Sequence, residues 1–340
     1  MENMTEMTNR ERFKKIMNFE TVDRMPMYEW APFWNLTMDR WISEGLDTKK
    51  LQYGEIGQKL GLDLLSQIGI PIKTEDYPNP LHYGDPVIYD AKDYERIKSS
   101  LYPSDIAERV RPQFDYYKKL HDDGEMASWI TYEGFFWYPR TLFGIENHFY
   151  AFYDQPELIH RINQDLVDFI LSTLDSICEI HIPDFMTFAE DMSYNHGPML
   201  SKDLFDEFIL PYYKQVIPAF KKKGIKVIID SDGDVTEMIP WLIEAGADGL
   251  LPLERQAGVD VLALKKAFPK FLFIGAYDKM VMKFGEDAMR EEFERLLPAI
   301  QMGGFIASVD HQTPPDVSLE QYNTYIRLLH EYSCKINSPT

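Results

Sequence analysis

The feature that most constrains the fold is a repeating alternation of short apolar runs with amphipathic helical segments. The runs lack the apolar–polar alternation of half-exposed strands, which is typical of strands buried on both faces of a parallel sheet. Eight such strands with intervening helices predict a single (β/α)8 TIM-barrel domain over residues 1–340, with an N-terminal helical extension. A doubly wound α/β sheet is the alternative, but no Gly-x-Gly-x-x-Gly motif follows any strand. The predicted strands cover residues 25–29, 64–68, 127–131, 185–189, 227–229, 249–251, 272–274 and 305–309.

Two helices have clear start signals, and one long loop is expected. Ser201 is an N-cap for an apolar 3–4 periodicity that runs to Gly224, and Ser318 with Gln321 forms a capping box for the last helix. Residues 75–90 are rich in Pro, Tyr and Asp, which predicts a long loop over the mouth of the barrel.

Ionisable side chains follow several of the predicted strands. Asp230 and Asp232 come directly after one strand, and Asp310 and His311 come directly after the last. Loops at the C-terminal ends of barrel strands form the active site in this architecture, so these side chains are expected to meet at one mouth. Carboxylates gathered there would repel one another, and a bound cation is expected to neutralise them. The other side chains at strand ends are Glu29, Trp30, Tyr132, Glu133, Glu190, Asp191, Glu254, Tyr277 and Asp278.

These residues also have purely structural interpretations. Asp232 or Asp234 would cap the helix that begins near Val235, and His311 would bond to the backbone inside the core. The occurrence of both features at strand ends favours a functional site.

Aromatic residues cluster directly after the strand at 127–131. Most large aromatic side chains belong to the core, yet the run Phe-Phe-Trp-Tyr at 135–138 is too bulky to bury beneath one loop. We therefore expect an aromatic-lined pocket at the mouth, suited to a flat substrate or a planar cofactor.

Composition limits the classes of binding partner and the cellular compartment that are expected for this chain. The formal charge of 35 − 55 = −20 disfavours nucleic acid and anionic membranes, and no apolar run reaches the roughly 20 residues of a membrane span. Residues 1–10 lack a signal-peptide core, and the two cysteines, Cys178 and Cys334, have no Cys-x-x-Cys spacing. These observations predict a reduced, cytoplasmic protein.

Several separate motifs resemble the uroporphyrinogen decarboxylase superfamily. The resemblance covers essentially the whole chain and implies a TIM barrel, in agreement with the strand count. The matching motifs are the stretch 9–26 (from Asn-Arg-Glu-Arg-Phe to Val-Asp-Arg-Met-Pro), Gly-Pro-Met-Leu-Ser at 197–201, Asp-Ser-Asp-Gly at 230–233, Glu-Ala-Gly-Ala-Asp at 244–248, and Gly-Gly-Phe-Ile-Ala-Ser at 303–308 with Pro-Pro-Asp at 314–316.

The superfamily carries out two kinds of chemistry, and the chain departs from the decarboxylase pattern. The decarboxylases carry an Arg-Gln-Ala-Gly-Arg loop that binds substrate carboxylates and a Phe-Ser-Asp motif that binds pyrrole nitrogens. The corresponding region here reads Tyr-Glu-Trp-Ala-Pro-Phe-Trp at 28–34, with no arginine before Arg40, and no Phe-Ser-Asp occurs. An acidic, aromatic pocket is a poor host for a polyanionic porphyrinogen.

The other branch resembles corrinoid-dependent methyltransferases, whose zinc is bound by a His-x-Cys pair after strand five and a Cys after strand eight. At the matching positions this chain has Asp230, Asp232 and His311, so both thiolates are missing. This resemblance assigns a divalent metal, with zinc as the expected ion, to Asp230, Asp232 and His311. An Asp/Asp/His set suits a metal that polarises oxygen.

These arguments predict a methyltransferase that takes a methyl group from an O-methyl donor, such as an aromatic methyl ether. The acceptor is Co(I) of a corrinoid (cobalamin) carried by a partner protein. The alternatives are a decarboxylase or lyase for a smaller acid, and a barrel that only binds a ligand or partner. The oligomeric state is left open, with a homodimer as one option. The expected catalytic residues are Glu190, Asp232 and His311, and the expected substrate-binding residues are Trp30, Tyr132, Trp137 and Tyr277.

Overall fold

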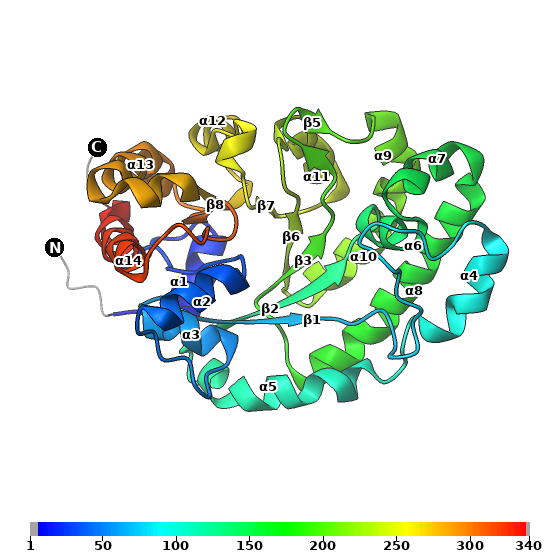
Figure 1. Ribbon diagram of the computed structural model, residues 1–340, viewed down its shortest axis with the longest axis horizontal. Coiled ribbons are helices and arrows are strands. Elements are labelled where there is room, and N and C mark those ends of the chain that lie inside the picture. The colour runs from blue at the N-terminus through cyan, green and yellow to red at the C-terminus, as the bar shows by residue number, and fades with distance from the viewer. Residues whose placement is uncertain (1–5, 338–340) are drawn as a thin grey trace.

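The computed structural model describes residues 6–337, except for the side chain of Tyr53, and is built on a curled sheet of parallel strands. The seven strands lie in the order β1-β2-β3-β6-β7-β8-β9, and every neighbouring pair is parallel (Figure 1). A separate short hairpin, β4–β5, follows β3. The strands are β1 (Leu64–Gly69), β2 (Met126–Glu133), β3 (Phe185–Ala189), β4 (Ser193–Tyr194), β5 (Gly197–Pro198), β6 (Lys226–Asp230), β7 (Gly249–Leu251), β8 (Leu272–Tyr277) and β9 (Phe305–Val309).

Helices cover the outer face of this sheet (Figure 1). The longest, α8, precedes β3, and the last two, α13 and α14, pack beside each other on either side of β9 in sequence. The helices are α1 (Asn9–Met17), α2 (Asn35–Ser43), α3 (Tyr53–Leu60), α4 (Ala91–Ile97), α5 (Ile106–Asp122), α6 (Trp137–Phe143), α7 (Ile145–Asp154), α8 (Pro156–Ile180), α9 (Lys202–Phe208), α10 (Leu210–Lys222), α11 (Ile239–Ala245), α12 (Val261–Ala267), α13 (Glu286–Gln301) and α14 (Leu319–Ser333). In the described part of the chain, no helix is both long enough and apolar enough to cross a membrane.

Seven of the eight predicted strands are confirmed, and the strand predicted at residues 25–29 is wrong. This segment lies between β9 and the start of β1. Its side chains, and not its backbone, accept the N–H groups of β9. The N–H of Ala307 contacts Met25 Sδ at 3.2 Å, and the N–H of Val309 donates to Glu29 Oε2 at 3.2 Å. Pro26 has no N–H to offer to a ladder. The sheet is therefore a curled α/β sheet of seven strands, and in the described part of the chain no further strand pairs with the outer edge of β1 or β9.

The helix predicted from Ser201 to Gly224 is divided into α9 and α10. Ser201 caps α9, since its hydroxyl accepts from the N–H of Leu204, as expected. The break falls at Ile209 because Pro211, in the first turn of α10, has no N–H and starts a new helix more readily than it continues one. The predicted capping box of Ser318 and Gln321 is present at the start of α14.

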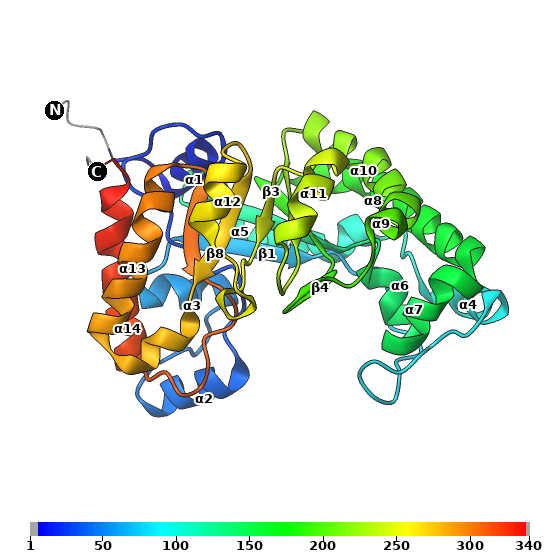
Figure 2. The ribbon, with the colours of Figure 1, turned by 90° about the horizontal axis from the view of Figure 1, so that it is seen from above.

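The N-terminal helical extension packs against the C-terminal part of the chain (Figures 1 and 2). Trp41 of α2 is fully buried and its indole N–H donates to the carbonyl of Val317 at 3.0 Å. Thr37 donates to the carbonyl of Thr313 at 2.7 Å. These bonds hold the loop after β9, which carries His311, against the first helices.

Candidate active site at the strand ends

Neighbouring strands β3 and β6 bring two acidic residues side by side. Ala189 pairs with Asp230 in the ladder, and the N–H of Asp191 lies 3.4 Å from the carbonyl of Asp230. Asp191 has a φ of 43°, in the left-handed region that costs a non-glycine residue about 1 kcal/mol. Such conformations concentrate at functional sites, where the surrounding structure holds them.

Three carboxylates converge at this point: Asp191, Asp230 and Asp232. One oxygen from each lies within 4.8 Å of the others, and this is a group that could hold a metal ion. Asp232 Oδ1 is buried without a hydrogen-bond partner. Across residues 6–337, no lysine or arginine forms a salt bridge with any of the three. A divalent cation would satisfy the orphaned oxygen and neutralise the repulsion, so these side chains fit such an ion.

The electrostatic environment of the cluster is shown by its pKa shifts. Burial raises the pKa of Asp191 to about 6, and the neighbouring charge of Asp232 contributes to this rise. Burial also holds the pKa of Asp230 well above its usual range, with smaller contributions from Asp191 and Asp232. Clustered, desolvated acids whose pKa values are displaced in this way are typical of functional sites.

His311 lies at the edge of the cluster. Its Nε2 is 3.5 Å from Asp232 Oδ2, and the hydrogen bond to Asp232 raises the pKa of the imidazole. The indole of Trp30 packs edge-on against the His311 ring at a centroid distance of 5.9 Å, and its N–H donates to the carbonyl of Val309 at 2.6 Å. Glu254 closes the other side, where its Oε2 accepts the N–H of Gly233 at 2.9 Å. The structure therefore brings the predicted residues Asp230, Asp232, His311 and Trp30 together.

Glu190, predicted as a catalytic group, does not join them. Its side chain is fully buried, and its two oxygens accept the backbone N–H groups of Phe135, Phe136 and Trp137 at 2.8, 2.8 and 3.0 Å. The hydroxyl of Tyr213 donates to the same carboxylate. With its lone pairs engaged in this way, Glu190 holds the start of α6 in place, and the acidic residue at the site is its neighbour Asp191.

Asp310 is likewise held away from the cluster. It is fully buried, accepts the N–H of Arg255 at 2.9 Å and forms a salt bridge with Lys279 at 3.0 Å.

Two of the predicted substrate-binding residues lie in the core instead. Tyr132 is fully buried, and its hydroxyl lies 3.0 Å from that of Thr173 in α8, on the helical side of the sheet. Tyr277 is fully buried against the rings of Phe293 and Tyr325, which belong to α13 and α14. Both side chains point toward the helices and not into the mouth, because alternate residues of a strand face opposite sides. The two substrate-binding predictions are corrected accordingly.

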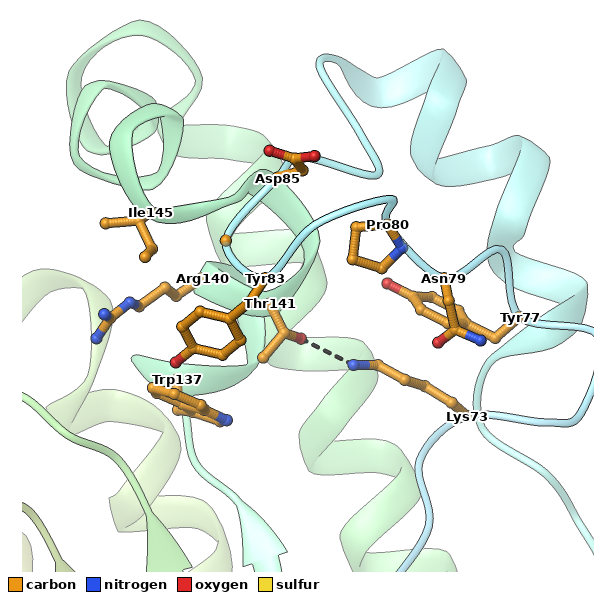
Figure 3. Close-up of a pocket in the computed structure, with 11 residues that line it drawn as sticks. Lys73, Tyr77, Asn79, Pro80, Tyr83, Asp85, Trp137, Arg140, Thr141 and Ile145 are labelled. Carbon is orange, nitrogen blue, oxygen red and sulfur yellow. Dashed lines mark hydrogen bonds between the residues drawn. The ribbon is translucent and has the colours of Figure 1, made fainter.

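The aromatic run at 135–138 is mostly core as well. Phe135, Phe136 and Tyr138 are fully buried, whereas Trp137 is half-buried and lines a cavity beside α6. The predicted loop at 75–90 forms the opposite wall of this cavity (Figure 3). Lys73 and Arg140, which also line it, carried no sequence signal because neither comes directly after a strand.

Most of the chain is similar to one family of known proteins. The family model for uroporphyrinogen decarboxylase (URO-D) matches residues 64–332. A uroporphyrinogen decarboxylase of Ruthia magnifica subsp. Calyptogena magnifica is 23% identical over 53% of this chain and 51% of its own length, so the chain spans about half of that relative. One of Chloroherpeton thalassium is 26% identical over 71% of this chain and 72% of its own.

A comparison of folds finds more distant structures. A Listeria monocytogenes structure assigned to vitamin-B12-independent methionine synthase is 10% identical, covers 93% of this chain and 99% of its own, and has a TM-score of 0.47. The match of the family model over most of the chain decides the assignment: the chain belongs to the uroporphyrinogen decarboxylase (URO-D) family.

Proposed function

We propose that this protein is a methyltransferase that moves a methyl group from an O-methyl donor to Co(I) of a corrinoid held by a partner protein. The observation that carries the proposal is the convergence of Asp191, Asp230 and Asp232 next to the imidazole of His311. An acidic mouth of this kind suits a cation and an oxygen-bearing substrate better than a polyanion.

Asp191, Asp230 and Asp232 would hold the divalent metal. A set of three carboxylate oxygens suits hard ions such as Mg²⁺ or Mn²⁺ at least as well as Zn²⁺. When bound, such an ion supplies Lewis-acid stabilisation of charge that develops on an oxygen. The predicted role of His311 as a further ligand competes with its pairing to Asp232, since a metal ligand must be a neutral imidazole.

His311 is assigned the role of proton donor. In the transfer, the O–CH3 bond breaks, both bonding electrons stay on the oxygen, and the methyl group forms its new bond with the electron pair of Co(I). The leaving oxygen then takes a proton from the imidazolium of His311, whose Nε2 faces Asp232. The hydrogen bond to Asp232, which raises the pKa of His311, keeps this proton available near neutral pH. Trp30 positions the imidazole ring of His311 by its edge-on contact.

A decarboxylase acting on a smaller acid is the second candidate, and it is favoured by the names of the relatives. The two functions differ in their products and in their need for a corrinoid.

The test uses the purified chain, a divalent metal, reduced cobalamin and a panel of methoxylated aromatic compounds. Methyl transfer predicts metal-dependent formation of methylcobalamin together with an equal amount of the phenol. Release of carbon dioxide without any need for the corrinoid would instead establish the decarboxylase.

A further inference from the structure

The cavity beside α6 has the size and the walls of a binding site for an aromatic ring. Its volume is about 180 Å³, and it lies between the segment 73–85 and α6 (Figure 3). A cavity of about 150 Å³ is enough for a benzene ring in another protein. Trp137 and Tyr83 contribute aromatic surface. Tyr77 also lines the cavity, and its buried hydroxyl has no hydrogen-bond partner in the described chain.

Two cationic side chains line the same cavity, in a chain whose formal charge is −20. Figure 3 shows Lys73 and Arg140 on opposite sides of the Trp137 ring. Lys73 Nζ donates to Thr141 Oγ1 at 3.1 Å, and the Arg140 guanidinium stacks over Trp137 at 5.0 Å. Within residues 6–337, Arg140 forms no salt bridge.

Two acidic residues lie near these cations, Glu133 and Asp85. Glu133 Oε1 lies 3.9 Å from Lys73 Nζ and forms a long salt bridge with it. Asp85 accepts the N–H of His82 at 3.1 Å and lies at the end of the cavity away from Lys73 (Figure 3). Among the described residues, the polar partners of Lys73 Nζ are the Thr141 hydroxyl and this long ion pair, so Lys73 can bind a ligand carboxylate in the cavity.

Two residues of α6 link this cavity to the strand that carries the carboxylate cluster. The N–H of Trp137 is bonded to Glu190, the residue before Asp191, and the charge of Arg140 acts on Asp191. A ligand that lies along Trp137 thus has Lys73 at one end and Arg140 at the other.

We propose that this cavity binds an aromatic carboxylate, with the ring on Trp137 and the carboxylate on Lys73 Nζ, which Thr141 holds in place. The proposal deepens the proposed function by giving the methyl donor an acidic group placed away from the metal site. The binding itself does not depend on methyl transfer, so it can be tested separately.

The test measures binding by calorimetry, with the full chain and no corrinoid. The probes are 4-methoxybenzoate and its uncharged isostere 4-methoxybenzamide. The acid should bind at least about tenfold more tightly, because a charge-assisted bond in a partly buried site is worth more than a neutral one. Lys73→Met should remove this preference for the acid, whereas the charge-conserving variant Lys73→Arg should keep part of it. Trp137→Leu should weaken both probes alike.

Lys222→Met is the matched control, because Lys222 is exposed in α10 and should leave both affinities unchanged. Thermal unfolding of each variant shows whether it is folded. Equal affinity for acid and amide, no binding of either, or an undiminished preference in folded Lys73→Met would overturn the proposal. Binding of the acid without methyl transfer would leave this site standing and remove only the proposed function.

Discussion

His311 Nε2 lies 3.5 Å from Asp232 Oδ2, although the two residues follow strands β9 and β6, which are not neighbours in the sheet. The curl of the sheet brings their loops together. From the sequence, both residues were expected to bind the metal. In the structure, Asp232 belongs to the carboxylate cluster and His311 lies beside it, in a position that fits the proposed role of proton donor.

Replacement of His311 separates these roles experimentally. His311→Gln should lower methyl transfer by about 10²–10⁴-fold, because the leaving oxygen loses its proton donor, while metal content stays unchanged. Asp232→Asn should lower both the rate and the metal content. Full activity in folded His311→Gln would remove the proton-donor role, and loss of metal in that variant would restore its predicted role as a ligand.

The cluster should bind a divalent cation even without substrate. Asp191→Asn and Asp230→Asn should each weaken the affinity for Mn²⁺ at least about tenfold, since changes to groups that merely support metal ligands already cost 10–100-fold. Asp168→Asn, an exposed carboxylate on α8, is the matched control. Titration calorimetry with Mn²⁺, Mg²⁺ and Zn²⁺ measures the effect. If Asp191→Asn binds as tightly as the unaltered chain, the site does not include Asp191.

Gly134 is required by the packing of Glu190. A Cβ at this position would overlap the carboxyl group of Glu190, which four donors hold in place. Gly134→Ala should lower the free energy of unfolding by about 3 kcal/mol, because it forces overpacking and leaves buried N–H groups unpaired.

Gly69→Ala provides the comparison, since a Cβ there meets no atom within 4 Å and should be tolerated. Chemical denaturation of the two variants measures both effects. Equal stability of Gly134→Ala and the unaltered chain would contradict the structural role of Glu190.

Glu29 should make stability depend on pH. Burial raises the pKa of Glu29 from 4.5 to about 7, although Ser308, Val309 and Tyr322 donate to its carboxylate. The folded protein therefore binds this proton more tightly than the unfolded chain. The resulting stability, about 3 kcal/mol at most, is complete below pH 4.5 and is lost as the pH rises through 7.

Glu29→Gln lacks the titrating group. Its free energy of unfolding relative to that of the unaltered chain should therefore rise by about 1–3 kcal/mol between pH 5 and pH 8. Urea unfolding at the two pH values measures the difference. Glu237→Gln, at an exposed position, should show no such gain. A constant difference at both pH values would show that Glu29 does not titrate in this range.

Local patterns determine much of this protein. Unalternating apolar runs mark seven strands because both faces of a parallel sheet are covered, and hydroxyl caps at Ser201 and Ser318 mark helix starts because they satisfy exposed N–H groups. Residues directly after strands must lie near one edge of a parallel sheet, so Asp230, Asp232 and His311 could be placed near one another from the sequence.

Tertiary structure decided which of these side chains face the site. Glu190 and Asp191 are adjacent, yet one is buried under α6 and the other lies in the cluster, because consecutive residues point in different directions. For the same reason Tyr132 and Tyr277 face helices. The segment at 25–29 has the composition of a strand, but the bonds that hold it come from the side chains of Met25 and Glu29. Lys73 and Arg140 line one cavity because the segment 73–85 folds against α6, a contact that no local pattern encodes.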